Sequence, residues 1–106
     1  MAKYLFHGSY TQAGIQGVLK DGGKGRRKAV EALAKSVGGS IESMYWAFGA
    51  DDFFVIGDLP NHAAAAALAA TTGAAGAVNI TTVVLLTADD IDAAIKLHPK
   101  YRAPGS

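Results

Sequence analysis

The chain contains no cysteine, and this absence excludes several kinds of site at once. Disulfide bonds, thiolate metal ligands, iron–sulfur clusters and a cysteine nucleophile all need that side chain. The three histidines, His7, His62 and His98, include no two at a spacing typical of a metal site. We therefore expect no bound metal and no cofactor.

Long apolar runs and an excess of one charge are missing as well. Ten lysine and arginine residues nearly balance nine acidic residues, so the formal net charge is +1. This gives no overall attraction to nucleic acid or anionic lipid. No apolar run reaches the roughly 18–20 residues of a membrane span, and the segment from Met1 to Tyr4 has no signal-peptide core. We expect a cytoplasmic protein that binds neither nucleic acid nor membrane.

Half of the 106 residues are apolar, but 21 of the apolar residues are alanine, which leaves 32 large apolar side chains for a core. A chain of this length makes one small domain that buries roughly 60–70% of the surface exposed by its unfolded form. The elements must therefore pack closely, and a partner subunit could complete the burial.

Alternating apolar side chains predict four strands, over residues 3–10, 40–48, 53–59 and 78–86. In the second strand, strict alternation places Ile41 and Tyr45 on one face and Glu42 and Met44 on the other. The turn between the second and third strands includes Asp51 and Asp52, which we expect to be exposed turn formers.

Apolar positions spaced by three and four predict an amphipathic helix over residues 25–37, after one or two helical turns over residues 15–19. An alanine-rich helix is predicted from the N-cap Asn61 to Ala70, followed by a loop. Thr87 to Asp90 resembles a capping box and predicts a last helix to about Leu97.

The order of elements is β-α-β-β-α-β with an added C-terminal helix. This is the ferredoxin-like α+β arrangement, an antiparallel sheet with two main helices on one face. We expect a single domain over residues 1–98 and a tail over residues 99–106. Large apolar side chains should lie on the uncovered face: Leu5, Met44, Trp46, Phe48, Phe54, Ile56, Val83 and Leu85. Such a face is a liability for a monomer, so we predict an obligate homodimer, or a higher homo-oligomer, packed face to face.

His7 is the first candidate for chemistry because it lies in the middle of a strand. A buried imidazole can act as a general base, a proton shuttle or a haem ligand, or it can be purely structural. Asp58, near the end of the third predicted strand, is a general base or a cap for the next helix, and capping is favoured. Tyr45 and Trp46 are aromatic candidates for lining a pocket, with core packing as the default role.

Half of the basic charge is concentrated within nine residues, at Lys20, Lys24, Arg26, Arg27 and Lys28. Glycines are interleaved with these residues, and basic side chains in the first turn of a helix oppose its dipole. The pattern predicts either an anion site at Arg26 and Arg27 or a solvated face. Arg26, Arg27 and Lys28 fall largely off the apolar stripe of the predicted helix.

A set of short pieces resembles the GYD domain family of the dimeric α/β-barrel superfamily, over about residues 3 to 95. The pieces are Tyr10-Thr11-Gln12-Ala13-Gly14, Gly38-Gly39, Tyr45, Gly49, Asp52, Asp58-Leu59-Pro60, Gly76 and Thr82. Asp51 stands where the pattern that names the family has tyrosine, so a chemical role of that tyrosine could not be filled here. The resemblance implies the fold and a dimer, and little chemistry.

The first functional hypothesis is a homodimer that holds a small apolar or aromatic ligand in a pocket of each subunit, between sheet and helices. His7, Tyr45, Trp46 and Asp58 are the expected ligand-binding residues. The resemblance extends the hypothesis to isomerase- or monooxygenase-like chemistry without a cofactor, and whether the protein is an enzyme stays open. The alternative is a structural or oligomeric interaction module without catalysis.

Two further interpretations carry less support. An RNA-recognition domain shares the order of elements but needs aromatic motifs on an open sheet face, which Phe53-Phe54 does not provide. Haem-degrading relatives in the same superfamily would imply a haem held by His7 or His62.

Overall fold

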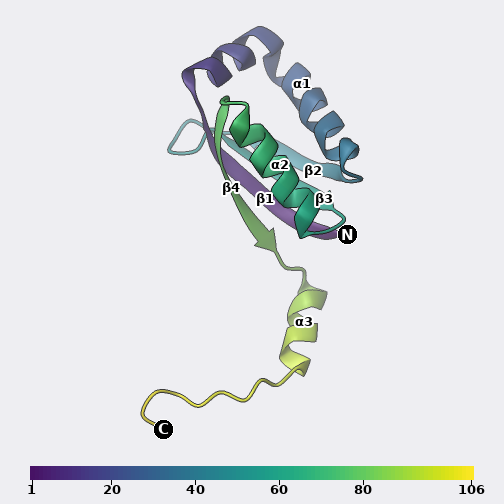
Figure 1. Cartoon of the computed structure of the whole chain (residues 1–106), viewed down its shortest axis with the longest axis vertical. Coiled ribbons are helices and arrows are strands. Elements are labelled where there is room, and N and C mark those ends of the chain that lie inside the picture. The colour runs from purple at the N-terminus through teal and green to yellow at the C-terminus, as the bar shows by residue number, and fades with distance from the viewer.

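The computed structural model describes the whole chain, residues 1–106. Its strands are β1 (Ala2–Tyr10), β2 (Ser40–Trp46), β3 (Phe53–Leu59) and β4 (Val78–Leu85), and its helices are α1 (Gln12–Ser36), α2 (His62–Ala74) and α3 (Ala88–Lys96). The strands form one sheet in the order β2-β3-β1-β4, with every neighbouring pair antiparallel. Helices α1 and α2 cover one face of this sheet (Figure 1). The predicted ferredoxin-like fold is confirmed.

Helix α1 is longer than the sequence predicts, because residues 20–24 between the two predicted helical pieces are part of it. It begins at Gln12 with Thr11 as N-cap and continues to Ser36. The helix bends at Gly22, whose backbone has φ 75° and ψ 168°. A positive φ is freely open only to glycine, so this residue lets two helical segments meet at an angle. The two segments correspond to the two predicted helical pieces.

Helix α2 also continues further than predicted. Asn61 is its N-cap, and its Oδ1 accepts a hydrogen bond from the Ala64 N–H at 2.9 Å. The predicted loop after Ala70 is wrong, since the helix runs to Ala74. The Thr72 hydroxyl donates to the Leu68 carbonyl at 2.8 Å, which satisfies this polar group inside the helix.

A register shift in β2 overturns the predicted division of its side chains between the two faces. It lies between Ile41 and Ser43, where the ladder with β3 is irregular. An extra residue in one strand moves the side chains before it to the opposite face. Ile41 therefore shares the helix-covered face with Met44, which is buried, and Glu42 reaches the other face. The sequence predicts Met44 and Trp46 on the uncovered face, and both assignments are wrong: Trp46 is paired with the buried Phe53 and lies on the helix-covered side.

The core lies between the sheet and the two helices. Its side chains come from alternate positions of the strands and from α2, with Tyr4 and Leu59 the largest that are fully enclosed. The buried cluster is Tyr4, Phe6, Met44, Phe53, Val55, Leu59, Ala65 and Leu68. Hydrophobic burial on this single face drives the packing of the helices onto the sheet.

The opposite face of the sheet carries no helix, as predicted (Figure 1). The side chains on what we call the open face include Leu5, Phe54, Ile56, Val83 and Leu85. Leu5, Phe54 and Ile56 alternate with buried residues of β1 and β3, and Val83 and Leu85 of β4 pair with Leu5 and Lys3 on the same face. Phe54 and Val83 are each 38% exposed. The open face therefore presents accessible apolar side chains in a single chain.

Helix α3 and the tail project away from the sheet (Figure 1). Its capping box is formed as predicted: the Asp90 N–H donates to Thr87 Oγ1, and the Thr87 N–H donates to Asp90 Oδ2. The helix buries none of its residues. The radius of gyration is 16.9 Å, above the value of about 13 Å for a compact chain of similar length. No helix has the length and apolar character needed to cross a bilayer.

Candidate ligand cavity

A cavity of about 200 Å³ lies between the helix-covered face of the sheet and helices α1 and α2. Fourteen of its sixteen lining residues are hydrophobic. Small side chains account for part of the space, because Ala29, Ala75 and Ala77 line the cavity where larger residues would fill it. The cavity is thus built into the core layer of the domain.

The polar groups of the cavity wall are Tyr10, Arg26 and Thr72. Trp46 Nε1–H donates to the Tyr10 hydroxyl at 3.0 Å. Arg26 Nη1 lies 3.5 Å from Asp21 Oδ2, a long contact for an ion pair. A second hollow of about 120 Å³ shares Tyr10 and Arg26 with the cavity.

Arg26 reaches the cavity because it continues the inward stripe of α1. The residues of α1 that line the cavity are Arg26, Ala29, Val30 and Leu33, at the spacing of one helix face. The expectation that Arg26 lies off this stripe is wrong. Its side chain is 34% exposed, so it lines the cavity and also reaches water. Extending the stripe by one turn would have located it from the sequence.

The segment Thr11 to Gly14 sets the position of Tyr10 and the start of α1. Thr11 N–H donates to the Ala77 carbonyl at 3.0 Å, and its hydroxyl donates to the Gly76 carbonyl at 2.7 Å. Gly14 is buried, and a side chain there would collide with the backbone of Ala77. The start of α1 therefore packs directly on the turn at Gly76 and Ala77 that leads into β4, beside Tyr10.

His7 lies on the open face and does not line the cavity. Its Nδ1 is 2.7 Å from Asp51 Oδ2, and its ring stacks on Phe54 with centroids 6.0 Å apart. Asp52 Oδ2 accepts from the Tyr10 backbone N–H at 2.9 Å. Both aspartates are half-buried and bonded, so the prediction of exposed turn residues is wrong. They tie the turn between β2 and β3 to β1.

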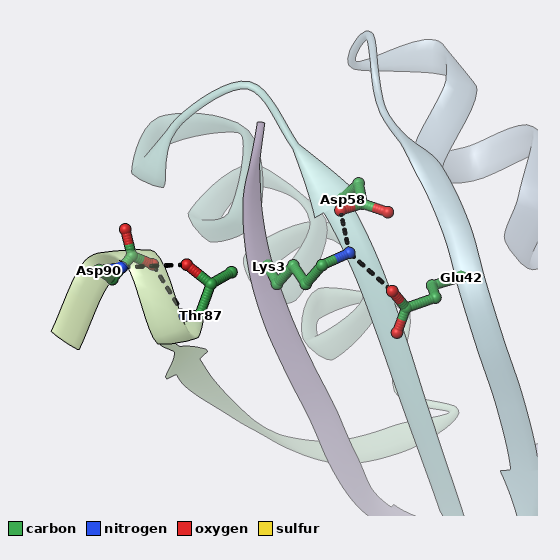
Figure 2. A network of polar contacts seen from close by, with 5 residues as sticks. All are labelled: Lys3, Glu42, Asp58, Thr87 and Asp90. Carbon is green, nitrogen blue, oxygen red and sulfur yellow. Dashed lines mark hydrogen bonds and ion pairs between the residues drawn. The ribbon is translucent and has the colours of Figure 1, made fainter. Parts of the chain in front are cut away.

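Asp58 also lies on the open face, in an ion-pair network with Lys3 and Glu42 (Figure 2). Lys3 Nζ donates to Asp58 Oδ1 at 2.8 Å and to Glu42 Oε1 at 2.6 Å. These two hydrogen bonds, first that to Asp58 and then that to Glu42, raise the pKa of Lys3 above its usual 10.5. Asp58 is not the helix cap, since Asn61 has that role.

The remaining candidates lie in different surroundings. Tyr45 is 71% exposed on the open face, and Trp46 is connected to the cavity only through its bond to Tyr10. Arg27 Nε lies 3.8 Å from Glu31 Oε1 one turn along α1, and Arg27 does not line the cavity. Of the residues predicted from sequence, Arg26 alone lines the cavity. Sequence reasoning did not propose Tyr10 or Thr72.

The other histidine considered for chemistry lies at the start of α2. His62 Nδ1 is 2.6 Å from the Tyr4 hydroxyl, and the two rings meet edge to face with centroids 5.7 Å apart. His7 and His62 are on opposite sides of the sheet. No group of three or more histidine, aspartate or glutamate side chains is arranged to hold a metal ion.

The family model of the GYD domain matches residues 4–95 of this chain. The chain belongs to the GYD domain family. No curated protein and no solved structure matches it. The matched region of the GYD domain contains the whole lining of the cavity and the His7–Asp51 pair of the open face, while Lys3 lies just before it. It also includes α3 as far as Ile95.

Proposed function

We propose that this GYD domain protein binds a small apolar or aromatic molecule in the cavity beneath α1 and α2. The observation that carries the proposal is the cavity itself: about 200 Å³ of space walled mainly by hydrophobic side chains. Ligand pockets combine apolar walls with a few polar groups that orient the ligand. Tyr10, Arg26 and Thr72 supply such groups here.

Isomerase- or monooxygenase-like chemistry in the cavity would have to use these same three side chains. No other hydroxyl or ionisable side chain lines its wall. His7 and Asp58 lie across the sheet, so neither is placed to act on a molecule bound there. The proposal is therefore ligand binding, with Tyr10 as the group nearest in kind to a general acid.

We further propose that two copies of the chain pack through their open faces. Leu5, Phe54, Ile56 and Val83 supply an apolar surface of the kind that soluble monomers rarely expose. Helix α3 supports the same proposal, because a helix of nine residues is marginal in water without packing. Its exposed Ile91 and Ile95 are one turn apart and form a second apolar surface for a partner.

The ligand proposal is tested by NMR titration of ¹⁵N-labelled protein with octanamide, a neutral amphiphile. We expect amide shifts confined to the cavity wall. Ala29→Phe places a bulky ring at the cavity and should weaken binding at least fivefold. Ala32→Phe is the matched control, because Ala32 lies on the same helix but does not line the cavity. Equal binding by both variants, or no binding by the native chain of either octanamide or the corresponding acid, would contradict the proposal.

A structural or oligomeric interaction module is the second candidate function, and the open face together with α3 favours it. Native mass spectrometry of protein purified without added ligand separates the two. A dimer that retains a small molecule supports ligand binding. A dimer without an adduct, combined with no shifts in the titration, supports the interaction module.

A further inference from the structure

We infer that the cavity selects an anion, and specifically a small apolar or aromatic carboxylate whose charged end meets Arg26 and Tyr10. This inference rests on the proposed function, since it names the class of ligand that the same cavity would take. It follows from the chemistry of the polar end of the cavity and from the distribution of charge along α1.

Arg26 is poorly satisfied by the protein. Its one ion-pair contact, to Asp21, is 3.5 Å long, beyond the usual range for a charge-assisted hydrogen bond. A guanidinium carries five N–H donors in a planar fork that matches a carboxylate. A partly buried charge beside apolar walls is costly without a partner. A carboxylate in the cavity would supply that partner.

Tyr10 adds a second donor at the same end. Its oxygen accepts the hydrogen bond from Trp46 Nε1, so its own proton remains available to donate. The Thr72 hydroxyl is already engaged with the carbonyls of Leu68 and Ala69. No aspartate or glutamate lines the cavity. The polar end thus presents donors and positive charge, which favours an oxyanion and disfavours an amine.

The charge along the chain points the same way. Residues 20–31 contain five basic side chains and two acidic ones, whereas the whole chain has a net charge of only +1. The positive charge is therefore gathered on the part of α1 that carries Arg26. A locally positive surface beside an apolar cavity raises the local concentration of anions.

The test compares octanoate with octanamide, and 4-phenylbutyrate with its amide, by fluorescence of Trp46, the only tryptophan. Each pair has the same apolar body and differs in charge. We expect each acid to bind about tenfold more tightly than its amide, as a charge-assisted hydrogen bond implies. Equal affinities would overturn this inference and leave the proposed function standing. No binding by any of the four would overturn both.

Two variants assign the preference to the residues. Arg26→Gln should remove the preference for the acid, so that acid and amide bind with equal affinity. Arg27→Gln is the matched control, since it removes the same charge from a neighbouring residue outside the cavity; it should retain the preference. An equal loss in both variants would overturn the role of Arg26. Tyr10→Phe keeps the ring against Phe53 and should weaken acid binding severalfold, which provides a second test if Arg26→Gln does not fold.

Discussion

The two faces of the sheet use the same strands for different purposes. On the helix-covered face, Phe6, Val55 and Leu59 are buried, and the remaining space forms a cavity with polar groups at one end. On the open face, polar side chains are paired with one another in two networks, around Lys3 and around His7. The comparison teaches that unsatisfied polar groups, more than ionisable groups as such, mark the candidate site. The Arg26 guanidinium has N–H donors without a partner in the protein, whereas His7 is paired with Asp51 and Asp58 with Lys3.

The largest expected effect comes from the covered face. Leu59→Ala removes a side chain with 0% exposure, and deletion of such a buried leucine costs about 3 kcal/mol through lost transfer energy and a new cavity. Urea denaturation followed by circular dichroism measures the change. Phe48→Ala is the control: Phe48 is fully exposed, and its change should be within about 0.5 kcal/mol. Similar losses in both variants would contradict the assignment of the core to one face.

The next prediction concerns the proposed dimer. Ile56→Lys places a charge in the middle of the open face, and burying it unpaired between two copies should raise the dimer Kd by about 100-fold or more. Size-exclusion chromatography with light scattering should show the mass fall to that of one chain, 10.9 kDa. Ala66→Lys, on the exposed side of α2, should leave the dimer intact. A native chain that is already monomeric at micromolar concentration would contradict the dimer.

A smaller effect is expected at the turn between β2 and β3. Asp52→Ala leaves the Tyr10 N–H without its acceptor and should cost about 1–2 kcal/mol. Asp51→Ala removes the partner of His7 and should cost about 1 kcal/mol or less, because both side chains are part exposed. Thermal unfolding of the two variants gives the ranking. A larger loss of stability in Asp51→Ala than in Asp52→Ala would show that the His7–Asp51 pair stabilises the turn more than the hydrogen bond from the Tyr10 N–H to Asp52 does.

The smallest effect is a pH dependence in the Lys3 network. Hydrogen bonds to Asp58 and Glu42 raise the pKa of Lys3 in the folded state. The two ion pairs therefore contribute fully to the stability of the folded state below the usual pKa of 10.5. Their contribution is lost as the pH rises through the raised value. Lys3→Met should therefore lose less stability than the native chain between neutral pH and strongly alkaline pH. Parallel pH profiles for the two proteins would mean that the network adds nothing to folding.

Most of the fold could be predicted from the sequence because its signals are local. The period-two strands, the N-cap at Asn61 and the capping box at Thr87 depend on residues a few positions apart. The register shift beside Ile41 leaves no such signal, because one extra residue changes the sheet face on which the β2 side chains lie without changing the composition of the strand. The length of α1 was underestimated because a glycine that breaks a helix and a glycine that bends one look the same in sequence.

The candidate site was less accessible to sequence reasoning. Side-chain chemistry points to His7, Tyr45 and Asp58, yet the structure places all three on the face opposite the cavity. Local charge points to Arg26, but the apolar stripe over residues 29–37 predicts the wrong side of the helix for it. Extending the apolar stripe of α1 by one helical turn toward the N-terminus would have placed Arg26 on the inward face of the helix.

The sequence alone determined the family, the order of the elements and the presence of apolar side chains on the sheet face that no helix covers. These properties follow from periodicity, propensity and composition, which act over a few residues. Tertiary structure decided which polar groups find partners. Lys3 meets Asp58 and His7 meets Asp51 across 55 and 44 positions of the chain. Only strand register brings such residues together. Only the bend at Gly22 and the packing of the start of α1 on the turn at Gly76 and Ala77 bring Arg26 and Tyr10 to the wall of a common cavity.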